Sequence, residues 1–349
     1  MTSAHPASAP AALKKLDLVC PRCNGALGAH DDAYLCAPCG AHYPLTEGIP
    51  DFRLFPDPYL SFAQDAERTS IVLAALERFD LRGLLEHYWS YSDITPIPLR
   101  KRFVESGLMG DQRAARLLKV IDKKNRGRPL AEQQVLEIGS GTGNFLAAAT
   151  RRYRQVVGLD IAMRWLHLSR RRFLDRAIEP PALICACAQH PPFDARSFDQ
   201  IVSASTLEFL DAQEEVFKNA ARLLKAGGQV FLTTANRYSI AENPYSGLWA
   251  VGWLPRHWQK RYVMARTGAS YGAVNTLSRR ELRAMSAELF ETLDFLLPEL
   301  DKETVAMLKP AQQWQARVYR ALRRTPGGDV ALSWITPQWD VHLTKASLD

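Results

Sequence analysis

Short apolar stretches alternate with amphipathic stretches between residues 134 and 235. Each apolar stretch is rich in β-branched residues and is bounded by turn-forming residues, which is typical of buried strands. The predicted strands are 134–138, 155–160, 183–188, 198–204 and 229–235. The predicted helices between them are 145–152, 165–176 and 214–224. Strands that alternate with helices at this spacing form βαβ units, so the pattern predicts a parallel sheet.

The pattern is different on both sides of this region. Apolar side chains recur at spacings of three and four over Ile71–Phe79 and Arg113–Ile121, which predicts helices between residues 56 and 130. Residues 236–277 are rich in Trp, Tyr, Pro and Gly and interrupt the alternation. Ser278-x-x-Glu281 is a capping box that should open a helix ending near Leu289. The last predicted elements are a strand near 293–297, a helix near 312–323 and a strand near 339–345.

These changes divide the chain into four parts. The parts are a disordered tail (1–15), a cysteine-containing module (16–55), a helical linker or lid (56–130) and an α/β domain (131–349) with an insertion at 236–277. No apolar run approaches the ~18 residues that a membrane span requires. The N-terminus has neither a cationic start nor an apolar segment of a signal peptide, so we expect a cytoplasmic protein. The oligomeric state is not indicated.

The composition is that of a basic globular protein. Hydrophobic residues make up 47% of the 349 residues, and the formal net charge is +7. Arginines and lysines cluster within 100–128, 151–154 and 170–176. Such clusters indicate either an RNA-binding surface or the solvated faces of helices, and the second interpretation is favoured.

Four of the six cysteines form two C-x-x-C pairs, Cys20/Cys23 and Cys36/Cys39. Each pair can form a tight turn that directs two thiolates at one ion. Gly25 and Gly40 give the backbone the conformational freedom it needs where its amides turn toward the sulfur atoms. Four thiolates leave no open coordination position, so the pattern predicts a structural zinc ribbon. Iron is an alternative metal, and His42 is a spare ligand. Cys185 and Cys187 lie in a predicted strand and are expected in the core.

A glycine-rich turn, Glu137-Ile-Gly-Ser-Gly-Thr-Gly143, follows the first predicted strand and precedes a helix. Glycines there let the backbone approach a ligand closely. Further motifs follow in order: GLD at the end of the second strand, PPFDARSFDQIV leading into the fourth, and RLLKAGGQVFLTT leading into the fifth. With these motifs the sequence resembles the class I S-adenosylmethionine-dependent methyltransferases, type 11-like, over roughly residues 130–240.

The resemblance implies a Rossmann-like sheet with helices on both faces, preceded by the small zinc ribbon. It also implies S-adenosylmethionine as the cofactor, beside the structural zinc. A dinucleotide-dependent oxidoreductase has a related fold, but its fingerprint would place a glycine at position 144, where Asn144 stands.

The roles of the cofactor-binding residues are also implied by the resemblance. The residues that would wrap the methionine part are Gly139, Ser140, Gly141 and Gly143, with Glu137 ordering the loop and facing the amino group. Those expected at the adenosyl part are Asp160 on the ribose hydroxyls, Ile161 on the adenine and Ala188 through its amide. Relatives often have an acidic residue where this chain has Cys187, and Gln189 is a plausible substitute. Ser205 and Thr206 should border the methyl group.

No catalytic base is evident. A hydroxyl acceptor would need one, and the candidates are His190, Glu208 and His257, with Tyr91 and Tyr245 as lid contacts. A structural or surface role is favoured for each of them. The residues after the fourth strand, SASTLEF, lack the Asn/Asp-Pro-Pro-Tyr/Phe motif of planar amino-group methylation. They also lack the cysteine used in 5-methylcytosine formation.

Three functions are consistent with these observations. Methyl transfer to a small organic or lipid-like acceptor is favoured, because Trp249, Trp253 and Trp258 in or beside the insertion are suited to lining an apolar pocket. Methylation of an RNA base, with the ribbon contacting RNA, is the first alternative. A binding module or pseudoenzyme whose ribbon recruits a protein partner is the second.

Overall fold

The computed structural model describes residues 10–347 apart from 93, 94, 96, 126, 269, 298–304 and 306–309. The chain forms two compact units. The first comprises Met1–Ser203, Lys218–Gln229 and Ser347–Asp349, and the second comprises Ala204–Phe217 and Val230–Ala346. Among the helices of the described residues, none is long and apolar enough to cross a membrane.

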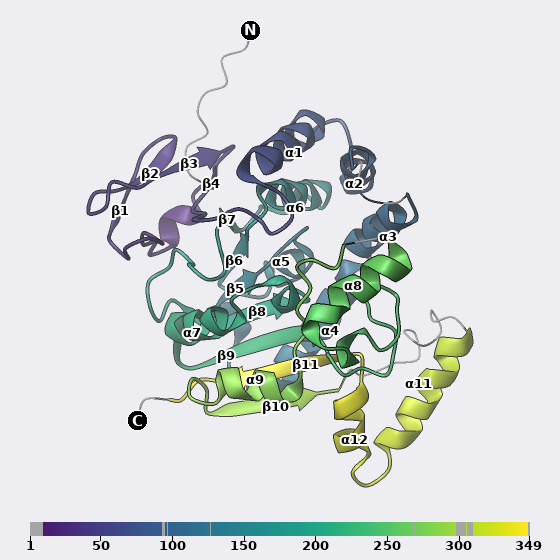
Figure 1. Ribbon diagram of the computed structural model, residues 1–349. Coiled ribbons are helices and arrows are strands. Elements are labelled where there is room, and N and C mark those ends of the chain that lie inside the picture. Colours follow the sequence, from purple (N-terminus) through teal and green to yellow (C-terminus); the bar gives the residue numbers. More distant parts are fainter. Residues whose placement is uncertain are drawn as a thin grey trace. The chain divides into compact units, whose positions relative to one another are not determined.

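The first unit begins with a small antiparallel sheet, drawn in purple in Figure 1. Its strands, paired in chain order, are β1 (Leu27–Ala29), β2 (Ala33–Cys36), β3 (His42–Thr46) and β4 (Ile49–Pro50). The rings of Tyr34 and Tyr43 lie 5.4 Å and 5.0 Å from the ring of Phe52, and all three side chains are buried. So small a core contributes little stability, which makes a second stabilising device necessary.

Four helices follow this module. They are α1 (Phe62–Ala75), α2 (Leu81–Ser90), α3 (Ile97–Leu108) and α4 (Gly110–Lys124). Ser61 opens α1 with a complete capping box. Helices α1 and α2 pack on α6 (Met163–Asp175), and α4 packs on α5 (Asn144–Ala149). Leu168 of α6 shares one buried cluster with Val72 and Leu84, so these helices form a packed layer.

The larger sheet contains seven strands in the order β10-β11-β9-β8-β5-β6-β7. The strands of the predicted methyltransferase region are β5 (Gln134–Ile138), β6 (Gln155–Asp160), β7 (Ala182–Cys185), β8 (Phe198–Ala204) and β9 (Leu224–Ala235). β5 pairs in parallel with both β6 and β8, and β6 pairs in parallel with β7. The carboxyl ends of β5, β6 and β7 therefore meet at one edge, as the predicted Rossmann-like fold requires.

The cysteine module is joined to the edge strand of this sheet by backbone pairing. Asp51 bridges Cys185 in parallel, and the amide of Phe52 donates to the carbonyl of Cys185 at 2.7 Å. A second bridge pairs Leu18 with Phe193. The exposed edge of β7 is thus covered by residues from the N-terminal part of the chain.

The second unit contains the helices and strands of the C-terminal part of the chain, together with part of α7. They are α7 (Gln213–Leu223, shared with the first unit), α8 (Arg256–Thr267), α9 (Arg279–Ser286), β10 (Thr292–Leu296), α11 (Pro310–Arg323), α12 (Gly328–Ile335) and β11 (Gln338–Thr344). Short 3-10 helices occur in this unit at Leu207–Phe209 and Val251–Trp253, and in the first unit at Leu130–Glu132. The capping box at Ser278 is confirmed, since its side chain accepts from the amide of Glu281 and the Glu281 carboxylate accepts from the amide of Ser278.

The structure differs from the sequence prediction, or adds to it, in three places. The tail predicted as disordered over 1–15 ends in a 3-10 helix, Leu13–Lys15, because Leu13 is buried; residues 1–9 lie outside the described part. The parallel arrangement predicted for residues 134–235 is found in the pairings of β5, β6, β7 and β8, whereas the later strands β10 and β11 pair antiparallel. Helix α12 was not predicted from the sequence.

Candidate cofactor and metal sites

The two cysteine pairs fold into turns with the same backbone hydrogen-bond pattern. In the first turn, the amide of Cys20 donates to Gly25 and its carbonyl accepts from Asn24; in the second, Cys36 is bonded in the same way to Ala41 and Gly40. The left-handed positions are Asn24 (φ 57°) and Gly40 (φ 68°). Gly25 is needed for space instead, because an added Cβ would lie 2.8 Å from Pro38.

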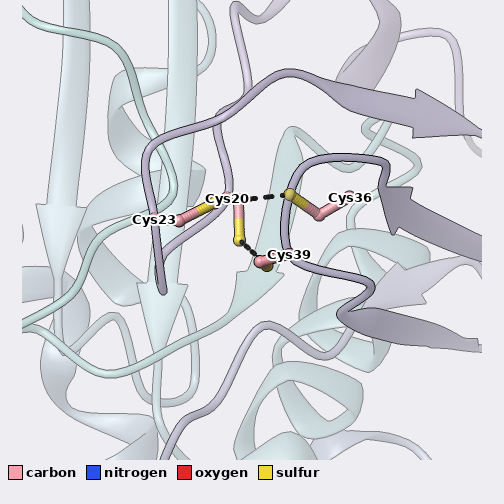
Figure 2. Close-up of side chains that lie close together, drawn as sticks. All are labelled: Cys20, Cys23, Cys36 and Cys39. Atoms are coloured by element: carbon pink, nitrogen blue, oxygen red, sulfur yellow. Dashed lines mark hydrogen bonds between the residues drawn. The ribbon is translucent and has the colours of Figure 1, made fainter.

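The four thiols face one another (Figure 2), and their Sγ atoms all lie within 4.8 Å. The contacts Cys20–Cys39 and Cys23–Cys36 measure 3.6 Å and 3.5 Å. Sulfurs at ~2.3 Å from a tetrahedral zinc ion lie about 3.8 Å from one another, so this donor set fits zinc. The hydroxyl of Tyr43 lies 3.1 Å from Cys20 Sγ and can orient that ligand. His42 is exposed and lies outside the cluster.

The glycine-rich turn adopts the backbone that its residues were expected to provide. Gly139, Gly141 and Gly143 all have positive φ, at 74°, 49° and 72°. An added Cβ at Gly143 would lie 2.1 Å from Ser169 Oγ, whereas one at Gly141 would meet no atom within 4 Å. Gly143 is therefore required for packing within the protein, and Gly141 leaves open space over the turn.

Two buried carboxylates flank this turn. The Asp160 carboxylate accepts from the amide of Gly141 at 2.8 Å and from the amide of Ala162 at 2.9 Å. Burial raises the pKa of Asp160 to about 6, although both amides lower it. Burial also raises the pKa of Glu137 well above its usual range, with a further contribution from the charge of Asp160. Oε2 of Glu137 has no hydrogen-bond partner among the described residues.

The turn at the end of β7 contains the predicted adenine-binding residues. Ala188 is buried, and within the described part of the chain its amide donates no hydrogen bond. Gln189 is partly buried, and its side-chain oxygen is also without a partner there. Cys187 is fully buried and is already engaged, since its Sγ contacts the amide of Leu54 at 3.4 Å and the carbonyl of Phe55 at 3.6 Å.

The first unit thus brings together Glu137, the turn 139–143, Asp160 and Ile161, while Ser205 belongs to the second unit. Ser205 directly follows β8, is exposed and has φ 55°, which residues other than glycine rarely adopt. Its amide donates to the carbonyl of Thr233 at 2.7 Å.

The candidate bases have different surroundings. His190 and His257 are exposed, and each contacts an aromatic ring, Phe55 and Trp258 respectively. Glu208 is 1% exposed, and burial raises its pKa. Its carboxylate accepts hydrogen bonds from Tyr245 of the insertion and, at 3.2 Å, from Thr234 of β9. Glu208 therefore anchors the insertion to β9. Tyr91 is 45% exposed at the end of α2.

Sequence reasoning missed the buried cations near the cofactor residues. Arg172 is 2% exposed, and its guanidinium donates to the carbonyl of Thr142 at 2.7 Å, within the glycine turn. Arg53 donates to the carbonyl of Ile161 at 3.2 Å, and Arg164 pairs with Asp65. The interpretation of the cationic helix 165–176 as a solvated face is wrong for Arg172, because α3 and α4 contribute partners to it at Gly107 and Asp111.

Comparison with known proteins supports the assignment of the sheet region. Residues 136–232 match the family described as "Methyltransferase domain". Over 130 residues the chain is 28% identical to the mitochondrial ubiquinone biosynthesis O-methyltransferase of Homo sapiens, covering 36% of this chain and 35% of that protein. Over 147 residues it is 27% identical to the malonyl-[acyl-carrier protein] O-methyltransferase of Marinomonas sp., covering 41% and 54%.

The chain also matches the biotin biosynthesis bifunctional protein BioHC of Cellvibrio japonicus, at 30% identity over 131 residues, 38% of this chain and 23% of that protein. It spans about half or less of the length of these curated relatives. Among solved structures, it aligns with geranyl diphosphate C-methyltransferase from Streptomyces coelicolor at 19% identity and a TM-score of 0.43, covering 68% of this chain and 76% of that one. The prediction of a methyltransferase domain is confirmed.

Proposed function

We propose that this chain transfers the methyl group of S-adenosylmethionine to a small organic or lipid-like acceptor. The observation that carries the proposal is the buried Glu137 carboxylate, which has an unpartnered oxygen beside an open glycine turn. A buried anion without a partner is costly, and a cationic ligand group stabilises it. The α-amino group of the cofactor has the required charge and would take this position.

The remaining contacts fit the adenosyl part. Each oxygen of Asp160 accepts one backbone amide and can accept a second donor, so the carboxylate can bind two ribose hydroxyls. The amide of Ala188 and the oxygen of Gln189 offer a donor and an acceptor to an adenine edge. Ile161 would pack against the ring. The open space over Gly141 would accommodate the methionine backbone.

The bound cofactor supplies an activated methyl group on a sulfonium. The protein therefore has to align the acceptor and exclude water, which can account for most of the barrier reduction. Arg172 fixes the glycine turn from behind through the Thr142 carbonyl, and Asp160 fixes it from the ligand side through the Gly141 amide. Both contacts hold the turn in its binding conformation before the cofactor arrives.

Two observations favour a small acceptor. Trp249, Trp253 and Trp258 are 54%, 57% and 59% exposed, so their surfaces are available to an apolar ligand. The curated relatives are named for O-methylation in ubiquinone biosynthesis and of malonyl-acyl carrier protein. The RNA alternative is weakened because Arg53, one of the few cations of the ribbon region, is only 6% exposed at its side chain and is occupied by carboxylates.

We also propose that Cys20, Cys23, Cys36 and Cys39 hold one structural zinc ion. All four ligands come from the chain, so the metal would stabilise the ribbon and take no part in methyl transfer. Iron at the same position would give a coloured protein, which an absorption spectrum and metal analysis distinguish from zinc.

The activity can be tested with S-adenosylmethionine labelled in its methyl group. The full chain is incubated with the labelled cofactor and a cell extract, and the products are separated into organic-soluble, aqueous and RNA fractions. We expect label in the small-molecule fractions, and none with the Asp160→Ala variant. Label confined to RNA would favour the first alternative. A wild-type protein that binds neither S-adenosylmethionine nor S-adenosylhomocysteine would refute the proposal.

A further inference from the structure

A buried network of two arginines and three aspartates connects the ribbon to the cofactor side of the sheet. Its members are Asp51, Arg53, Asp57, Asp65 and Arg164, whose side chains are 20%, 6%, 4%, 0% and 5% exposed. Arg53 binds both oxygens of Asp51, at 2.8 Å and 2.6 Å, and one oxygen of Asp65 at 2.6 Å. Arg164 binds the other oxygen of Asp65 at 2.5 Å and Asp57 at 2.7 Å. With so little solvent access, these pairs fix their groups in one geometry.

Arg53 also reaches the turn that follows Asp160. Its Nη1 donates to the carbonyl of Ile161 at 3.2 Å, and the thiol of Cys185 contacts the same carbonyl at 3.5 Å. Two residues further on, the amide of Met163 donates to Asp65 at 3.3 Å. The peptide between the ribose carboxylate and α6 is thus oriented by the ribbon side of the molecule. A rotation of this peptide would turn both the Asp160 carboxylate and the Ile161 side chain.

The residues that directly follow Arg53 hold the second turn of the proposed adenine site. The amide of Leu54 and the carbonyl of Phe55 both contact the Cys187 thiol, and the Phe55 ring contacts His190 edge-on at 6.0 Å. Burial raises the pKa of Cys187, so the thiol stays protonated and can donate to Phe55. A carboxylate at position 187 would face the Phe55 carbonyl in this buried place, which accounts for the cysteine found there.

We propose that Arg53 is a positioning residue for the adenosyl end of the cofactor site. Its guanidinium fixes the Ile161 carbonyl, and the adjoining segment 54–55 fixes Cys187, so one stretch of chain holds both turns between which the adenine binds. This inference rests on the proposed function, because it requires that residues 160–161 and 187–189 bind an adenosyl group. It goes beyond it in making a residue outside the methyltransferase domain a determinant of cofactor affinity.

The test compares two ligands, S-adenosylhomocysteine and 5′-methylthioadenosine, the second of which lacks the amino-acid part. Their dissociation constants are measured by titration calorimetry on the full chain. In Arg53→Gln and Arg53→Lys we expect both ligands to bind ~10-fold more weakly, because the adenosyl contacts are lost. In Glu137→Gln we expect weaker binding of S-adenosylhomocysteine alone. Lys at position 53 keeps the charge but cannot hold Asp51, Asp65 and Ile161 together. The melting temperature of Arg53→Lys should therefore lie closer to the wild-type value than that of Arg53→Gln, while its affinity for both ligands stays reduced.

Arg170→Gln is the matched control. Arg170 also joins α6 to the ribbon, through the carbonyl of Glu47 at 2.8 Å, but it does not contact residues 160–163 or 187. We expect its affinities to stay within about twofold of wild type, and metal analysis to show the same metal content in all variants. Arg53 variants that bind both ligands as wild type does, or no more weakly than Arg170→Gln, overturn the inference. If Arg53→Gln does not fold, Arg53→Lys and Cys187→Ala decide by the same criterion. A wild type that binds neither ligand refutes the proposed function itself.

Discussion

Replacing Asp160 with alanine removes a carboxylate that has two roles in the proposed site, as an acceptor for backbone amides and as an acceptor for the ribose hydroxyls. In the free protein its carboxylate accepts the amides of Gly141 and Ala162, and with cofactor bound it would also accept two ribose hydroxyls. A hydrogen bond to a charged group contributes ~1.5–3 kcal/mol. Two such bonds correspond to about 3 kcal/mol at the lower end, and relaxation of the glycine turn offsets part of this. We therefore expect affinity for S-adenosylhomocysteine to fall by ~10-fold to 100-fold.

The same substitution should leave the stability nearly unchanged. Burial raises the pKa of Asp160 to about 6 in the folded protein, above the unfolded value of about 3.9. The stabilising effect of its proton is complete below pH ~4 and is lost as the pH rises to ~6, so at pH 7 the ionised group costs about 3 kcal/mol. Alanine removes this cost but leaves the amides of Gly141 and Ala162 without acceptors, at ~1–3 kcal/mol each. The two effects oppose each other.

Asp199→Ala is the control for this experiment. Asp199 is a carboxylate that also accepts a backbone amide, that of Gln134 at 2.9 Å, but at the opposite end of β5 from the glycine turn. Titration calorimetry and thermal unfolding at pH 7 should show lost affinity with an unchanged melting temperature for Asp160→Ala, and retained affinity for Asp199→Ala. Equal affinities of the Asp160 variant and the wild type would refute the ribose assignment.

Three further predictions concern the same sites. The affinity for S-adenosylhomocysteine should decrease as the pH is lowered through about 6, because protonation removes the charge of Asp160 and turns one of its two acceptor oxygens into a donor. Calorimetry from about pH 8 to pH 5 checks this, and an unchanged affinity contradicts it. Cys36→Ser should lose about one zinc ion per chain and unfold at lower temperature while still binding cofactor, and metal analysis that finds no zinc in the wild type would dispose of the ribbon assignment. Gly143→Ala should destabilise the protein by more than ~2 kcal/mol, because its Cβ meets Ser169. Gly141→Ala should fold at a cost of about 1 kcal/mol and lose cofactor binding. Chemical unfolding measures the first effect and calorimetry the second, and similar behaviour of both variants would contradict the reasoning.

Local signals predicted the strands next to the residues proposed to bind the cofactor. The bounds of β5, β6 and β8 agree with the sequence prediction, since each is an apolar run that ends at glycine or polar residues. The two cysteine turns were also predictable, because the C-x-x-C spacing and the glycines that follow each pair are both visible in the sequence. The network around Arg53 was not predictable. Its partners lie 2, 12 and 108 positions away along the chain, and hydrophobic periodicity contains no information about such pairs.

There is a physical reason why the sequence predicts the role of Gly143 but not the roles of Arg172 and Arg53. Gly143 combines a left-handed φ with a neighbouring side chain that leaves no room for Cβ, and only glycine satisfies both conditions. The need for glycine at this position can therefore be recognised from the sequence. Arg172 and Arg53 act by donating to backbone carbonyls, those of Thr142 and Ile161, and a carbonyl accepts from any donor that reaches it. A sequence accordingly reveals where the backbone must adopt a glycine-only conformation, but the side chains that hold the turn in place are found only when the folded chain brings them there.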